Sequence, residues 1–293
     1  MTTAGLARTE TADTTATATG ADAGAGAPAL LFALRLGLAR GAWETKQFFR
    51  SRMQMFFTFS MPVVMLMLLS AIFHFKDPAT GVSGPQIFTA GMIGVGIMGS
   101  SLQSLSLQIA GERHYGMLKR LRGTPLPKSS YFIGKIIMVL VSSLGQVAVL
   151  LAVGRLFFGV RLPVDAAHWA TLGWVYALGV AACSLLGIAY SNLIRSPDSG
   201  AVVMLPMTVL QFVSGVFFIF SQLPKGMQVF ASFFPLKWLC QGLRSALLPQ
   251  ARARAEPAGG WEHGRIALVL GLWAVAGLLL CLRTFRWKGR KDG

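Results

Sequence analysis

The sequence contains six apolar runs of about 20 residues each, and none of them includes an acidic residue. A helix needs about 20 apolar residues to cross the hydrocarbon core of a membrane. The expected transmembrane helices cover residues 55–75, 87–110, 131–153, 169–190, 201–221 and 266–283. Only 13% of the chain is charged and 54% is hydrophobic, whereas about a quarter of an average soluble chain is charged. We therefore predict an all-α integral membrane protein whose six-span domain covers residues 54–286.

The segments outside these runs indicate how the chain lies in the membrane. Residues 1–28 lack both the basic and the apolar region of a cleaved signal, so we expect a disordered tail. Residues 29–53 predict an amphipathic interfacial helix, with a helix buried against the bundle as the alternative. Basic residues gather in these segments, in residues 111–128 and in a basic tail at 287–293. This bias predicts a multi-pass plasma-membrane protein with both termini in the cytoplasm.

Residues 111–128 form a charged loop between the second and third runs. Read as a helix, it has charged residues on one side and a mainly apolar side with His114, Met117, Leu118 and Leu121. Thr124 and Pro125 suit the N-cap and first turn of a new helix, so the first helix should end near Gly123. Such a helix can lie on the membrane surface and be held by a soluble partner. The alternative is a basic loop that only fixes the topology.

The long loop before the last run, residues 222–265, holds two short stretches rich in aromatic residues. Prolines at positions 224 and 235 precede them, and neither stretch is long enough to span a membrane. Two short amphipathic helices dipping into the outer leaflet would satisfy their backbone groups and bury the aromatic rings. A surface loop with scattered aromatic residues is the alternative.

Each of the two loops contains a set of residues that matches a known signature. The first set is Glu112, Arg113, Gly116, Leu118, Leu121, Thr124, Pro125, Gly134 and Lys135. The second set is Leu223, Pro224, Pro235, Leu236, Leu243 and Arg244. Both sets resemble signatures of type-2 ABC-transporter permeases, and with the order of spans the resemblance covers roughly residues 40–290. His114 and Met117 depart from the first signature, where an acid and a threonine are usual.

The resemblance implies a function for each loop. The first would be a coupling helix that docks on a separate cytosolic ATPase, with Arg120 as a flanking charge. The second would be a re-entrant outer motif. Two ATPase copies would serve a permease homodimer or heterodimer.

Several chemistries are disfavoured by what the sequence lacks. It has no G-x-x-x-x-G-K-[ST] motif, so we expect ATP and Mg to be bound by the partner and no cofactor by this chain. The absence of acidic residues from the runs disfavours an ion-coupled carrier. No catalytic or metal-binding arrangement occurs within them. The net charge of +16 could suggest nucleic acid, but the basic residues flank apolar runs, which fits membrane orientation better.

Neutral polar residues inside the runs are candidates for a cargo path. They are Ser101, Ser104, Gln108, Gln146, Gln211 and Ser214. Hydrogen bonding between helices is the alternative role for each of them. Together they suit an amphiphilic cargo better than an ion, and the resemblance favours a hydrophobic drug, antibiotic or secondary metabolite. Export of a polysaccharide or lipid, and a membrane scaffold that transports nothing, are the alternatives.

Overall fold

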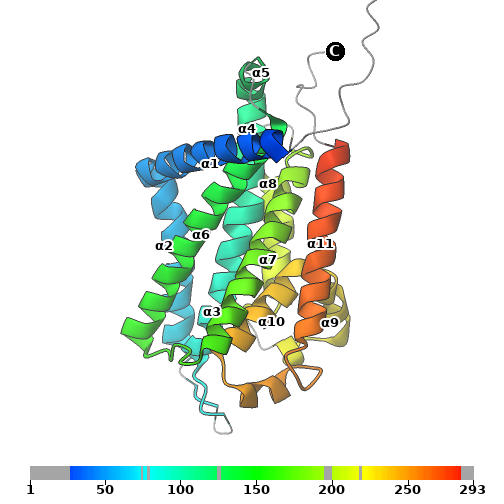
Figure 1. Cartoon of the computed structure of the whole chain (residues 1–293). Helices are drawn as coiled ribbons and strands as arrows, with labels where there is room; N and C mark the ends of the chain where they lie inside the picture. The colour runs from blue at the N-terminus through cyan, green and yellow to red at the C-terminus, as the bar shows by residue number, and fades with distance from the viewer. Residues whose placement is uncertain are drawn as a thin grey trace, which may run out of the picture.

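The computed structural model describes residues 27–73, 75–77, 80–123, 127–194, 200–217 and 220–284, which form a helical bundle (Figure 1). Within these residues, five helices are long and apolar enough to cross a membrane. They are α2 (Arg52–Ile72), the continuous unit of α3 (Gly84–Met98), η1 (Gly99–Ser104) and α4 (Leu105–His114), α6 (Lys128–Phe158), α7 (Ala166–Tyr190) and α11 (His263–Thr284). The all-α class is confirmed, and these helices match five of the six expected spans.

Helix α8 (Ala201–Val213) differs from the span expected at residues 201–221. Its 13 residues extend about 20 Å at 1.5 Å per residue, about two-thirds of a bilayer core. The helix ends before a turn at Gly215, whose φ is +74°. A Cβ added to Gly215 would lie 2.8 Å from the Cβ of Phe220, so glycine suits both the conformation and the space. The expected end was wrong because an apolar composition does not reveal this turn.

Helix α1 (Ala27–Arg50) lies across one end of the bundle, inclined to the long helices (Figure 1). It packs along α6, and a Cβ added to Gly37 or Gly41 would lie only 2.6 or 2.7 Å from the side chain of Ile133 or Ile137. Small residues therefore let the two backbones approach closely. The other face exposes apolar side chains, including that of Trp43. One face of α1 is thus buried against the bundle, and the other face is exposed.

The opposite end of the bundle contains η3 (Phe220–Gln222), α9 (Lys225–Ser232), α10 (Pro235–Leu247) and η4 (Gln250–Ala255) (Figure 1). Every residue of α10 is buried, and the helix packs against α3, α7 and α11. The expectation of a helix lying in the outer leaflet is therefore wrong for α10, because protein surrounds it. Helix α9 does expose apolar side chains, among them Val229 and Phe230.

Both ends of the described chain, the start of α1 and the end of α11, lie at the same end of the bundle (Figure 1). Some sequence expectations fall outside the described residues. These are the N-terminal tail up to residue 26, the pair Thr124 and Pro125, and the basic tail at 287–293.

Candidate functional site

The charged loop forms the tip of the bundle at the end where α1 lies (Figure 1). Helix α4 ends at His114, and a short helix, α5 (Met117–Arg122), follows after a turn. Gly116 in this turn has a φ of +72°, a left-handed conformation that glycine adopts most readily. The single helix expected up to Gly123 is therefore wrong, because the chain breaks at Gly116. We call the segment from Tyr115 to Arg122 the α5 tip.

Glu112 lies just before this break and faces the interior instead of a partner. Its carboxylate accepts hydrogen bonds from the hydroxyl of Tyr131 (2.7 Å) and from Lys135 Nζ (2.5 Å), both on α6. Lys135 also pairs with one carboxylate oxygen of Glu44 on α1 (3.1 Å), and Arg40 pairs with the other oxygen of Glu44 (2.9 Å). The side chains of Lys135 and Glu44 are only 3% and 4% exposed. Glu112 thus joins the end of α4 to α6 and, through Lys135, to α1.

Arg113 makes the corresponding connection to α7. One of its terminal nitrogens donates to the backbone oxygen of Ser191 (2.6 Å), and the other donates to Oδ1 of Asn192 (3.1 Å). Both acceptors follow directly after the last residue of α7. Glu112 and Arg113 therefore attach the base of the α5 tip to three helices. The sequence placed them on a surface helix because the pattern of charges does not identify distant partners.

The outward face of the α5 tip differs from the predicted one. Leu118 is 1% exposed and belongs to the hydrophobic core, and Leu121 packs against that core. On the side that the sequence predicted to be apolar, Leu118 therefore faces the bundle and is not available to a soluble partner. The side chains that point outward include Tyr115, Met117 and Arg120; Tyr115 is 71% and Met117 46% exposed.

The neutral polar residues of the spans have separate surroundings. Gln146 donates to the backbone oxygen of Thr58 on α2 (2.7 Å) and fills the space beside Gly96, which is a packing role. Ser101 and Ser214 are buried, and neither hydroxyl has a hydrogen-bond partner in the described part of the chain. The other three, all partly buried, are Ser104, Gln108 and Gln211. Ser101 and Ser104 both lie on η1, a π-helical segment in contact with α6, α7 and α8; such segments often occur at functional sites.

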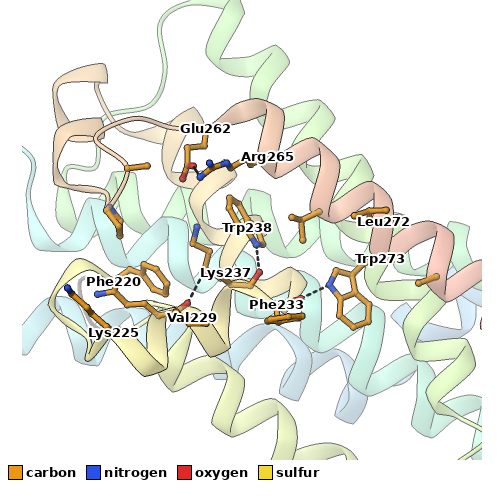
Figure 2. A pocket seen from close by; sticks show the side chains of 16 residues that line it. Phe220, Lys225, Val229, Phe233, Lys237, Trp238, Glu262, Arg265, Leu272 and Trp273 are labelled. Atoms are coloured by element: carbon orange, nitrogen blue, oxygen red, sulfur yellow. Dashed lines mark hydrogen bonds and ion pairs between the residues drawn. The ribbon is translucent and has the colours of Figure 1, made fainter.

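A cavity of about 990 Å³ lies between α9, α10 and α11, and none of those six polar residues lines it (Figure 2). The residues on its polar side include Lys225, Lys237, Glu262 and Arg265, and those on its apolar side include Phe233, Leu272 and Trp273. The sequence did not predict this cavity. Its only signal was the mixture of aromatic and basic residues in the long loop.

A family model for ABC-2 family transporter proteins matches residues 78–283. The chain belongs to the ABC-2 transporter family. The match extends from before α3 into α11, so it includes the α5 tip and the cavity, whereas α1 and α2 lie outside it. No curated protein sequence matches the chain. Membership makes this chain the membrane subunit of an ABC transporter, which is not itself the catalytic chain and whose family normally works with an ABC ATPase.

In this ABC-2 chain the residues of the second signature, from Leu223 to Arg244, lie at the start of α9 and along α10. Pro224 immediately precedes α9 and Pro235 is the first residue of α10, positions where a missing N–H does no harm. Leu223, before Pro224, is partly exposed, whereas Leu236 is fully buried. The two prolines thus mark the starts of both helices.

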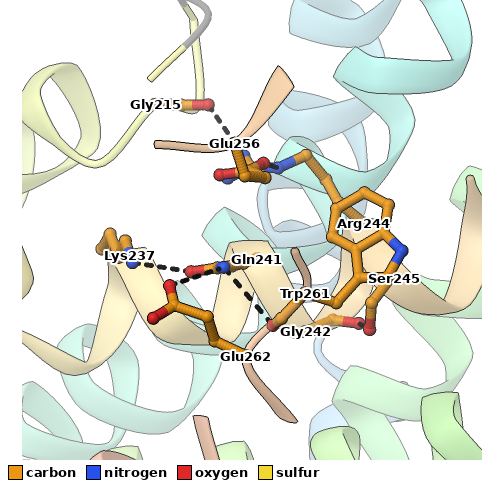
Figure 3. Close-up of polar contacts among 9 residues, drawn as sticks. All are labelled: Gly215, Lys237, Gln241, Gly242, Arg244, Ser245, Glu256, Trp261 and Glu262. Carbon is orange, nitrogen blue, oxygen red and sulfur yellow. Dashed lines mark hydrogen bonds and ion pairs between the residues drawn. The ribbon is translucent and has the colours of Figure 1, made fainter. Parts of the chain in front are cut away.

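Arg244 is the central residue of a polar network inside this end of the ABC-2 bundle (Figure 3). It pairs with Glu256 through Nε (2.9 Å) and donates to the backbone oxygen of Gly215 (3.2 Å). Lys237, on the same helix, donates to Gln241 (2.6 Å). Burial lowers the pKa of Lys237 to about 8, although the negative charges of Glu256 and Glu262 oppose this shift. Arg244 therefore connects α10 to the turn after α8 and to the loop before α11.

Proposed function

We propose that this chain is the permease subunit of an ATP-driven exporter and that a separate cytosolic ATPase docks on the α5 tip. The observation that carries this proposal is the attachment of the tip. Its outward face bears Tyr115, Met117 and Arg120, while Glu112 and Arg113 at its base bind α6 and the end of α7. A surface that is both exposed and firmly attached suits the transmission of a force.

The transmission would follow these contacts. When the ATPase pair closes on ATP and Mg, it pushes on the α5 tip, and α4 moves with it. Hydrogen bonds in which at least one partner is charged, which are short and strong, pass the displacement through Glu112 to α6 and α1 and through Arg113 to the end of α7. The helices then move as a group and open the cargo path at the far side, as in other rigid-body transitions.

The proposed topology has six crossings, both termini in the cytoplasm and the protein in the plasma membrane. Between the end of α7 and the start of α11 the chain must return along the bundle, because both ends of the described chain lie together (Figure 1). Helix α8, followed by the turn at Gly215, supplies this sixth crossing. Lipid offers no hydrogen bonds to the backbone groups of this turn. The surrounding protein supplies them instead, for example where Arg244 donates to the backbone oxygen of Gly215.

The cargo we propose is a hydrophobic or amphiphilic compound such as a drug, an antibiotic or a secondary metabolite, carried by a dimer of permeases with two ATPase copies. Neutral polar residues around η1 support this choice. Stimulation of ATPase activity by candidate compounds, measured on the reconstituted complex, distinguishes this cargo from a lipid or polysaccharide. A scaffold would show no stimulation by any of them.

Photo-crosslinking tests the docking site. A photoreactive amino acid replaces Tyr115 at the tip or, as a control, Val164 in the loop between α6 and α7, which is 95% exposed. We expect irradiation of cells to link the Tyr115 position, and not the Val164 position, to a protein that contains a P-loop. Docking on the α5 tip is refuted if no ATPase is captured at Tyr115, or if it is captured equally at Val164.

A further inference from the structure

The cavity between α9, α10 and α11 has a polar and an apolar side. Among the described residues that line it, Lys225, Lys237 and Arg265 supply three positive charges, and Glu262 is the one carboxylate (Figure 2). Glu262 already pairs with Arg265. The lining therefore keeps an excess of positive charge, which is complementary to an anionic group.

Of these three cationic side chains, Lys237 is the buried one. The residue is 4% exposed, and within the described chain it donates one hydrogen bond, to Gln241 Oε1 (2.6 Å). Its ammonium lies 3.4 Å from the centre of the Trp238 ring, and no carboxylate of the described residues forms an ion pair with it. Because an ammonium has three N–H groups, and Gln241 and the Trp238 ring do not occupy all of them, Lys237 can still donate to a ligand in the cavity.

The apolar side follows α11 away from the charges. From Arg265 to Ala276 the helix rises about 16 Å at 1.5 Å per residue, close to the depth of one leaflet, which is half of a core about 30 Å thick. Leu272 and Phe233 line this side and are 60% and 74% exposed. Apolar side chains exposed on a membrane helix face lipid, so the cavity opens sideways to the bilayer.

We propose that this cavity binds an anionic phospholipid of the surrounding bilayer. Its phosphate lies beside Lys237 and Arg265, and an acyl chain lies along α11 toward Ala276. The lipid comes from the leaflet opposite the α5 tip, because the charged side of the cavity is at the start of α11 and the tip is at the other end (Figure 1). This site is independent of cargo and ATPase, and it needs neither for binding.

Native mass spectrometry of the purified, delipidated full chain tests the proposal. The protein is titrated with dioleoyl-phosphatidylglycerol or with dioleoyl-phosphatidylcholine. We expect the anionic lipid to bind the wild type about tenfold more tightly, because a hydrogen bond to a charged group is worth about one factor of ten or more. The substitution Lys237→Gln should remove most of this preference and leave the binding of phosphatidylcholine unchanged.

Two further variants secure the result. Arg161→Gln removes one charge from the exposed loop between α6 and α7, outside the cavity, and should keep the full preference. Arg265→Gln changes a residue that is 71% exposed, so it should fold normally and weaken the preference even if Lys237→Gln fails to fold. Equal binding of both lipids by the wild type overturns the proposal, as does a preference that persists in both cavity variants. Displacement of the lipid by glycerol phosphate alone would show an anion site without a lipid chain and would also overturn it.

Discussion

Replacing Lys135 with Met should destabilise the attachment of the α5 tip to the bundle. Lys135 is 3% exposed and lies between two carboxylates, 2.5 Å from Glu112 and 3.1 Å from Glu44. Removing the ammonium leaves both carboxylates without their shared partner. Breaking a buried ion pair in this way typically costs about 3–5 kcal/mol.

The remaining contacts place the expected loss near the lower limit of that range. Glu44 keeps its ion pair with Arg40 at 2.9 Å, and Glu112 keeps the hydrogen bond from Tyr131 and is 18% exposed. We therefore expect a loss of about 3 kcal/mol. At about 2 °C per kcal/mol for a chain of this size, the melting temperature should fall by about 6 °C.

The measurement is the thermal unfolding of the purified protein in detergent, with Lys46→Met as the control. Lys46 is an exposed residue of α1, so its replacement should change the melting temperature by less than about 1 °C, as surface substitutions usually do. The double variant Lys135→Met/Glu112→Gln should recover about 1–2 kcal/mol, because it no longer leaves the Glu112 charge uncompensated. If Lys135→Met melts like Lys46→Met, these ion pairs do not stabilise the attachment and the proposed transmission route fails.

Two other predictions concern the lipid site and α1. Because burial lowers the pKa of Lys237 from 10.5 to about 8, its ammonium is mostly charged at pH 7 and mostly neutral at pH 9. The preference for phosphatidylglycerol should therefore weaken in the wild type between pH 7 and pH 9 and stay constant in Lys237→Gln; an unchanged wild-type preference would contradict this. Gly41→Ala places a Cβ 2.7 Å from Ile137 and should lower the melting temperature, since overpacking costs about 1–3 kcal/mol. Gly271→Ala, whose Cβ would meet nothing within 4 Å, is the control that should not lower it.

The long helices were predictable because one physical requirement, a bilayer core about 30 Å thick, fixes the length of an apolar run. That requirement does not determine where a helix ends once the run continues past a turn. Residues 214–217 are as apolar as the end of α8, yet the chain turns there at Gly215. The end depends on the contact of this turn with Phe220 and Arg244, which no local pattern contains.

The charges of the α5 tip show a different limit. Their helical spacing predicted one helix up to Gly123, and this spacing is the same whether a charge faces solvent or a distant partner. Glu112 is joined to α6 by a residue 23 positions later, and that residue also binds Glu44 on α1. Gly116 alone did not mark the break, since an isolated glycine within a helical pattern is only a weak signal.

The buried network of α10 extends this argument to the far end of the bundle. Charged residues are almost never fully buried unless they are paired, so Lys237 and Arg244 give no sign in the sequence that α10 lies inside the bundle. Arg244 is instead buried because Glu256 and the Gly215 oxygen, from two other elements, satisfy it. Lys237 has no such carboxylate within the described chain, only Gln241 and the aromatic rings of Trp238 and Phe220. Of the two buried cations of α10, it is therefore Lys237, on the cavity wall, that still has charge and donors to offer to an anionic ligand.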